Sequence, residues 1–245
     1  FGWLDEAMDA LYENGIYAIL ATPSAARPAW LSQKYPEVQQ VRPDRVRALF
    51  GERQNHCYTS PIFREKVRTV NRKLAERYKD HPALIAWHVS NEYMGYCNCE
   101  LCEAAFRDWL KIKYENDLDR LNKAWWTSFW GHTYSSWEQI EAPAPHGSKT
   151  LHALNLDWKR FCTHNITEFY KNEIAPLKEI TPDIPVTTNL MGTYPDINYH
   201  QLAPYLDVIS WDNYPRWHSD SPDREIAFNT AFKHDINRCL KDGQP

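Results

Sequence analysis

Several features of common protein classes are missing from this sequence of 245 residues. No apolar run approaches the roughly 18 residues of a membrane-spanning helix. The 28 basic and 32 acidic side chains give a net charge of −4, without the basic excess of a nucleic-acid-binding protein. The Gly-x-Gly-x-x-Gly dinucleotide motif, the phosphate-binding P-loop and the His-Glu-x-x-His zinc motif are also absent. We therefore expect no membrane partner, no nucleic-acid partner and no organic cofactor.

Glycine is scarce, with 8 residues, whereas aromatic residues are abundant, with 11 Trp, 14 Tyr and 9 Phe. The remaining composition is that of a soluble folded domain. Flat aromatic faces are typical of sugar-binding clefts, but a large aromatic core produces the same composition. The tract from Trp125 to Trp137 leaves the same two interpretations open, a cleft entrance or a packed core.

Helical and strand patterns alternate along the chain. Helices are expected near residues 3–12, 63–80, 101–114, 116–125, 154–179 and 223–241, and strands at 16–21, 84–89, 184–190 and 208–211. Each strand is a continuous apolar run, which predicts burial on both faces and a parallel sheet in an α/β fold. Polar residues follow the strands, as in a TIM (β/α)8 barrel, where loops after the strands build the site.

A complete barrel needs eight strands, and the chain offers four clear ones. We therefore expect residues 1–245 to form the middle portion of one catalytic (β/α)8-barrel domain, with a closing stretch from Asp242 to Pro245 after the last helix. The chain starts at Phe1 in an amphipathic segment, without a signal peptide or an initiating Met, so the true N-terminus is expected upstream.

Glu92 is the first candidate for catalysis. It follows the apolar strand 84–89 directly, in the sequence Ser90-Asn91-Glu92-Tyr93. Partial burial favours the neutral form of a carboxyl group, which allows it to act as a general acid near neutrality. Asn91 beside it can donate a hydrogen bond to a substrate hydroxyl. The competing interpretation is a loop glutamate in a surface ion pair.

Four of the six cysteines have the spacing of a metal site. Cys97-x-Cys99-x-x-Cys102 forms a cluster, and Cys57 precedes it on another loop. Four thiolates form a closed ligand set that leaves no position for water, so the pattern predicts structural zinc. The alternative is a group of reduced, unpaired thiols, and His56 is a possible substitute ligand.

Six stretches occur in an order that resembles glycoside hydrolase family 42, the microbial β-galactosidases, over nearly the whole chain. They are residues 21–31, 53–61, 87–93, 121–125 with 129–130, 188–192 and 210–215. The resemblance implies that the chain runs from the helix after barrel strand 2 to the helix before strand 7. It also implies a cytoplasmic bacterial enzyme that is a homotrimer in its full-length form.

The activity implied by the resemblance is a retaining β-galactosidase that hydrolyses terminal non-reducing β-D-galactosyl residues of oligosaccharides by double displacement. Glu92 corresponds to the acid/base, and Arg53, Asn91 and Tyr214 correspond to substrate-binding residues. The family's nucleophile, a Glu after strand 7, is expected beyond residue 245. The resemblance also supports the four cysteines as zinc ligands, and it disfavours Asp212 as a nucleophile, leaving it to orient Tyr214 or a sugar hydroxyl.

Other functions remain open at this point. The nearest alternative is another retaining barrel glycosidase of the same clan, because an Asn-Glu pair after the fourth strand is shared across that clan. A non-catalytic sugar-binding relic is a second, since no nucleophile is identified among these residues. A metal-dependent barrel hydrolase would need His and carboxylate ligands around an open coordination position, and such spacings are not evident.

Overall fold

The structure is a computed structural model that describes residues 1–147 and 149–241. The closing stretch 242–245 lies outside the described residues. The chain divides into two compact units. The sheet unit comprises Phe1–Ala26, Lys66–Tyr93 and the chain from Tyr170 onward, and the cysteine unit comprises Arg27–Glu65 and Met94–Phe169.

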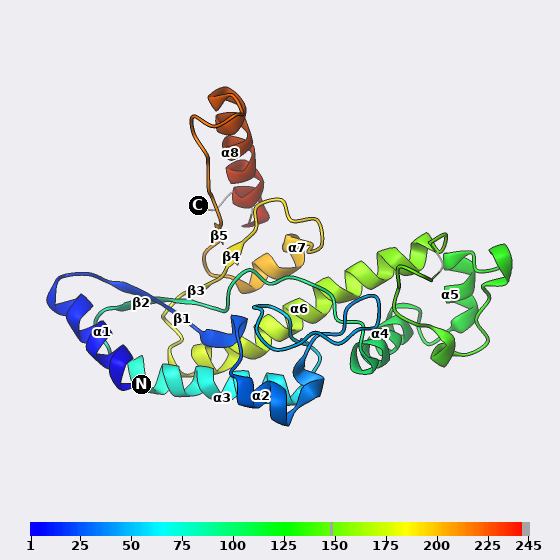
Figure 1. The fold of residues 1–245 in the computed structure, drawn as a ribbon, viewed down its shortest axis with the longest axis horizontal. Coiled ribbons are helices and arrows are strands. Elements are labelled where there is room, and N and C mark those ends of the chain that lie inside the picture. The colour runs from blue at the N-terminus through cyan, green and yellow to red at the C-terminus, as the bar shows by residue number, and fades with distance from the viewer. Residues whose placement is uncertain (148, 242–245) are drawn as a thin grey trace. The chain divides into compact units, whose positions relative to one another are not determined.

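The sheet unit contains short parallel strands (Figure 1). They are β1 (Ala18–Ala21), β2 (Leu84–His88), β3 (Val186–Thr187), β4 (Asn189–Leu190) and β5 (Ser210–Trp211). The pairing order is β1-β2-β3 in one sheet and β4-β5 in another, and every pair is parallel. Only Thr188 separates β3 from β4, so the expected strand 184–190 pairs with β2 through its first half and with β5 through its second. Within the described residues these strands form open sheets, not a closed barrel.

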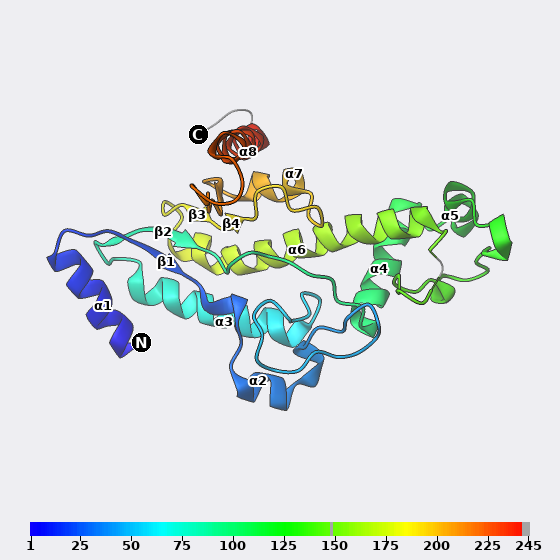
Figure 2. The same ribbon diagram turned by 45° about the horizontal axis from the view of Figure 1, so that its top comes forward.

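Helices cover part of this sheet (Figures 1 and 2). The sheet unit contains α1 (Gly2–Glu13), α7 (Tyr199–Leu202) and α8 (Asp223–Arg238), and it shares α3 (Pro61–Tyr78) and α6 (His152–Ile180) with the cysteine unit. Trp87 of β2 is fully buried, and its indole N–H donates to Thr181 Oγ1 just after α6, at 3.0 Å. Val186 pairs with Trp87 in the sheet, and Tyr78 of α3 and Leu177 of α6 are buried in the same unit.

The cysteine unit has a core rich in aromatic rings. Its helices are α2 (Ala29–Lys34), α4 (Glu100–Lys113) and α5 (Leu118–Trp125), with the first parts of α3 and α6. Phe106 of α4 packs edge-on against Trp158 of α6, with 5.0 Å between ring centroids, and Phe161 lies beside both rings. Asp117 accepts a hydrogen bond from the backbone N–H of Arg120 and so caps the start of α5.

The α/β fold and the long helices agree with the expectation from the sequence, whereas two details differ. The short helices α2 and α7 were not predicted, since each has fewer than two full turns and little periodicity. Within the described residues the strands are not buried on both faces, whereas the sequence pattern predicts such burial for a complete barrel. Ile19 of β1 is 58% exposed and Ile85 of β2 is 47% exposed, because no described element covers these side chains. None of the described helices combines the length and the apolar character needed to cross a membrane.

Candidate functional site

Glu92 lies just beyond the carboxyl end of β2, half-buried beside Asn91. Two residues of this segment have left-handed backbone conformations, Ser90 with φ 58° and Glu92 with φ 43°. Such conformations are unfavourable for residues with a Cβ and persist only where neighbouring contacts enforce them. One of these contacts is the hydrogen bond from the Ser90 backbone N–H to Thr22 Oγ1, which follows β1, at 2.8 Å.

Asn189 of β4 connects this segment to the end of β5. Its Oδ1 accepts the backbone N–H of Glu92 at 2.9 Å, and its Nδ2 donates to Asn91 Oδ1 at 3.2 Å. The same Nδ2 donates to both carboxylate oxygens of Asp212, at 3.0 Å each. Because a carboxylate only accepts hydrogen bonds, Asp212 fixes which end of the Asn189 amide faces Glu92.

Sequence reasoning did not single out Asn189, although an amide near the carboxyl end of a predicted strand is a signal that could have identified it. For Asp212, the family resemblance disfavours the role of nucleophile and leaves it to orient Tyr214 or a sugar hydroxyl. In the structure, Asp212 accepts hydrogen bonds from Asn189, a contact that the sequence does not predict. Asp212 is therefore part of the network that orients the segment around Glu92.

The side chain of Asn91 also reaches the carboxyl group, with Nδ2 donating to Glu92 Oε2 at 3.2 Å. The charges of Asp212 and Glu92 also act on Tyr199, whose hydroxyl accepts the backbone N–H of Met191 at 3.0 Å. Burial raises the pKa of Tyr199 to about 12, and the negative charges of Asp212 and Glu92 act in the same direction. Tyr199 therefore keeps its proton at neutral pH.

The other predicted sugar contacts lie at the surface. Tyr214 follows β5, is 81% exposed, and lines a hollow with Trp211 and with Lys233 of α8. Arg53 belongs to the cysteine unit, where it is exposed on the loop that leads to Cys57. The structure brings Asn91 and Glu92 together, and the sugar-binding roles of Arg53, Asn91 and Tyr214 stay predictions.

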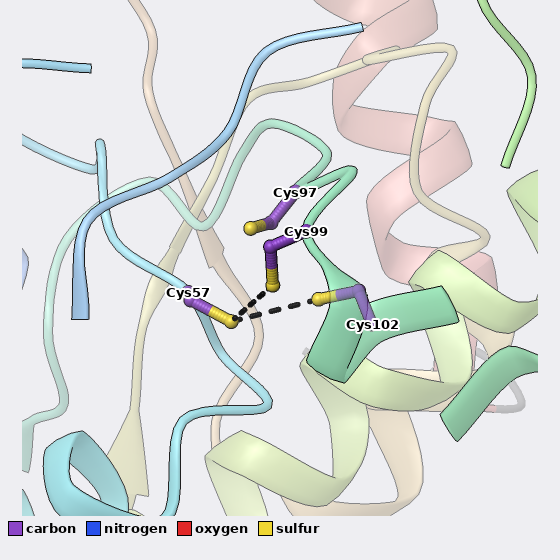
Figure 3. A group of neighbouring side chains, drawn as sticks. All are labelled: Cys57, Cys97, Cys99 and Cys102. Carbon is purple, nitrogen blue, oxygen red and sulfur yellow. Dashed lines mark hydrogen bonds between the residues drawn. The ribbon is translucent and has the colours of Figure 1, made fainter. Parts of the chain in front are cut away.

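The four predicted metal ligands converge inside the cysteine unit (Figure 3). Cys57 comes from the loop before α3, Cys97 and Cys99 from the loop after Met94, and Cys102 from the first turn of α4. All four are buried, and their sulfurs lie within 4.8 Å of one another. Cys57 Sγ is 3.6 Å from Cys99 Sγ and 3.5 Å from Cys102 Sγ, far beyond the length of a disulfide bond.

These distances suit a tetrahedral metal ion. Zinc–sulfur bonds of about 2.3 Å place the sulfurs of a four-thiolate site roughly 3.8 Å apart. Polar groups also point at the sulfurs, since the backbone N–H of Val41 donates to Cys97 Sγ at 3.3 Å and Thr59 Oγ1 lies 3.1 Å from Cys102 Sγ. Donors of this kind stabilise thiolates and orient them toward a cation. The donor set therefore fits a closed metal site.

Electrostatics within the cluster favour the same interpretation. Contact with Cys57 Sγ, then with the other two sulfurs, raises the pKa of Cys102, whereas contacts with Cys102 and Cys57 lower the pKa of Cys99. Four thiolates this close repel one another, and a divalent cation would offset that repulsion. His56 lies outside the group of ligands, packed 4.3 Å from the Phe63 ring. Burial lowers its pKa to about 3, so His56 is neutral.

Comparison with known proteins decides the family. The family model described as beta-galactosidase of glycoside hydrolase family 42 matches residues 1–245. The chain belongs to glycoside hydrolase family 42. It is 59% identical to beta-galactosidase Pbg of Clostridium perfringens over the whole chain, which covers 36% of Pbg. It is 60% identical to beta-galactosidase BglY of Alicyclobacillus acidocaldarius over 98% of the chain and 35% of BglY.

A solved family 42 structure has the same fold. The beta-galactosidase of Rahnella sp. R3 superposes with a TM-score of 0.96 at 54% identity, over 99% of this chain and 36% of that protein. The chain therefore spans about a third of the length of the relatives that it matches. The α/β arrangement described above is the arrangement of part of a family 42 catalytic region.

The aromatic tract of this family 42 chain divides between core and surface. Trp125 is buried, and its indole N–H donates to Tyr114 Oη at 3.0 Å and to Asp157 Oδ2 at 3.1 Å. Trp126 and Trp130 are 70% and 76% exposed, and Phe129 stacks on Trp126 with 5.6 Å between centroids. Packing thus explains Trp125, while the cleft interpretation of the exposed rings stays a prediction.

Proposed function

We propose that the chain is part of the catalytic (β/α)8 barrel of a retaining β-galactosidase that releases terminal non-reducing β-D-galactosyl residues from oligosaccharides. One observation carries the proposal: the Asn91-Glu92 pair lies at the carboxyl end of a parallel strand in a chain that matches family 42 over its whole length. Active sites of such barrels are built at the carboxyl ends of the strands. Closure of the barrel requires strands outside residues 1–245.

Glu92 is the acid/base in this proposal. It protonates the departing glycosidic oxygen while a second carboxylate, about 5 to 5.5 Å away, attacks the anomeric carbon. Glu92 then takes a proton from water as the glycosyl-enzyme is hydrolysed. The second carboxylate is expected beyond residue 245. Asn91 holds Glu92 Oε2, and Asn189 fixes the Glu92 backbone, so that both proton transfers use one orientation of the carboxyl group.

Arg53, Asn91 and Tyr214 are the proposed galactose contacts. Their side chains offer the donors and acceptors that sugar hydroxyl groups require. The trimeric assembly and the cytoplasmic location stay predictions that depend on the resemblance.

Cys57, Cys97, Cys99 and Cys102 are proposed to hold one structural zinc ion. When bound, zinc supplies a cross-link between the loop before α3 and the loop before α4, with no open position for substrate or water. The convergence of four buried sulfurs supports this assignment.

Azide rescue of Glu92→Gly in the full-length protein tests the proposed activity. The variant is expected to lose most hydrolysis of an aryl β-galactoside with a poor leaving group, and azide is expected to restore turnover of one with a good leaving group. β-Galactosyl azide is the expected product, because azide enters on the face of the glycosyl-enzyme that water normally attacks.

The outcomes separate the alternatives. If Glu92→Gly kept wild-type activity on substrates with poor leaving groups, the acid/base assignment would be contradicted. A wild-type protein that hydrolyses a different glycoside would favour another glycosidase of the clan, and one that binds galactose without turnover would favour the sugar-binding relic. Asp212→Asn is the matched carboxyl variant, and rescue of this variant with α-galactosyl azide as product would identify Asp212 as the nucleophile.

A further inference from the structure

The segment that carries Glu92 is held on the C-terminal side of Glu92 by a buried glutamate. Glu173 of α6 is fully buried. One of its carboxylate oxygens accepts the hydroxyl of Tyr93 and the other accepts the hydroxyl of Ser24. Tyr93 follows Glu92 directly, and Ser24 lies in the short 3-10 helix that follows β1. Glu173 therefore joins the carboxyl ends of β1 and β2.

A buried carboxylate is costly unless hydrogen-bond donors compensate it. Glu173 meets this requirement with one hydroxyl group on each carboxyl oxygen, Tyr93 on one and Ser24 on the other. Glu173 is itself held, since the side chain of Asn71 on α3 donates to the Glu173 backbone carbonyl at 3.1 Å. Asn71 is fully buried too. Glu173 therefore lies at a buried contact between α3 and α6.

The backbone between β2 and Tyr93 needs such an anchor. Ser90 and Glu92 both have positive φ values, and a segment strained in this way relaxes when its restraints are removed. Thr22 restrains the segment at Ser90, and Asn189 restrains it at the Glu92 N–H. Tyr93 is 3% exposed and provides the restraint on the C-terminal side of Glu92.

We propose that Glu173 and Tyr93 are positioning residues, which hold the strained Ser90–Glu92 segment so that the Glu92 carboxyl group stays aligned for proton transfer. The proposal rests on the proposed role of Glu92 as acid/base. Loss of the Tyr93–Glu173 hydrogen bond lets the segment relax, and the carboxyl group then meets the leaving-group oxygen less often. The resulting defect is specific for substrates whose leaving group needs a proton.

Tyr170 provides a matched control. It lies on α6, its ring packs edge-on against Tyr93 with 5.8 Å between centroids, and it is fully buried. Among the described residues its hydroxyl has no hydrogen-bond partner. Tyr170→Phe and Tyr93→Phe therefore each remove one buried hydroxyl from neighbouring rings, and only Tyr93→Phe removes a restraint on Glu92.

The test measures kcat/KM for two aryl β-galactosides, one with a good and one with a poor leaving group, in the full-length protein. The quantity compared is the value for the good leaving group divided by the value for the poor one. The ratio of the two values does not depend on the fraction of active protein, so partial unfolding leaves it unchanged. We expect Tyr93→Phe to raise the ratio about tenfold or more, since general acid catalysis contributes at least a hundredfold. Tyr170→Phe is expected to leave the ratio at the wild-type value.

Glu173→Gln gives an independent measurement if Tyr93→Phe does not fold. The amide keeps the shape of the side chain but accepts hydrogen bonds at only one of its two ends, so the ratio is expected to rise in this variant as well. Equal ratios for wild type, Tyr93→Phe and Glu173→Gln would overturn the inference.

The control for the proposed function is Glu92→Gly. If this variant shows azide rescue while the ratios stay equal, the positioning role alone fails. A wild-type protein without β-galactosidase activity would remove the proposed function and the positioning role together.

Discussion

Asp157 is a buried carboxylate of the cysteine unit with several hydrogen-bond donors around it. It is 2% exposed and accepts hydrogen bonds from Lys113, Tyr114, Trp125 and Arg160. Burial raises its pKa, but the hydrogen bonds from Lys113, Tyr114 and Trp125 outweigh burial and hold the pKa below the ordinary value of 3.8. The charge of Asp157 therefore stabilises the folded state at neutral pH.

The pH dependence of stability follows from the sign of this shift. A carboxyl group whose pKa is lower in the folded state stabilises the protein above the unfolded-state pKa, and the contribution disappears as the pH falls through the folded-state pKa. We expect Asp157→Asn to lower the free energy of unfolding by about 3 kcal/mol at pH 7, since it leaves buried donors unpaired. The difference from wild type should shrink below pH 4, as followed by urea unfolding across a pH series.

Asp108→Asn is the control for this prediction. Asp108 lies on α4 with a side chain that is 72% exposed and pairs with Lys111, so its replacement is expected to change the free energy of unfolding by less than about 0.5 kcal/mol. A difference between wild type and Asp157→Asn that stays constant down to pH 2 would contradict the assigned charge.

At the scale of elements, sequence spacing predicted the group of four cysteines, and the structure brings their sulfurs together. Cys97, Cys99 and Cys102 lie within six residues, and the role of Glu92, a few residues after an apolar strand, stays a prediction. Asn189 and Glu173 were not predicted, since their partners lie about 80 to 100 residues away, at Tyr93, Asn91 and Glu92. Such contacts depend on the pairing of strands and helices, which periodicity does not reveal.

The cysteine cluster connects two elements, so its loss should affect both. We expect one zinc ion per chain in purified full-length protein, measured by elemental analysis. Cys57→Ser is expected to lose the metal and to lower the thermal unfolding midpoint, since structural metal binding contributes directly to folding free energy. Cys239→Ser replaces an exposed thiol and is expected to keep both. Zinc-free protein with an unchanged midpoint would contradict the structural role.

At the scale of the whole molecule, the exposed face of the sheet tests whether the barrel closes. Ile19 on β1 is 58% exposed, and the proposed barrel would cover it with further strands. Ile19→Lys in the full-length protein is then expected to lower the free energy of unfolding by about 3 kcal/mol or more, because it buries an unpaired charge. Ile112 on α4 is 81% exposed, and Ile112→Lys is expected to change the free energy of unfolding by less than about 0.5 kcal/mol.

Urea unfolding of the two variants decides the question. Equal effects of Ile19→Lys and Ile112→Lys would mean that this face of the sheet stays open to water. The barrel could be anticipated from the sequence only as an incomplete pattern of strands, because closure depends on residues beyond the four strands that the pattern indicates.

The stretch Val186–Leu190 pairs with β2 through β3 and with β5 through β4, with only Thr188 between them. A deletion or insertion of one residue there would shift the register of one pairing relative to the other. It would also turn the following side chains to the opposite face of the sheet, and Asn189 would point away from Glu92. The exposed loop 215–222, between β5 and α8, has no comparable constraint. Natural variation in chain length is therefore expected in that loop and not in Val186–Leu190.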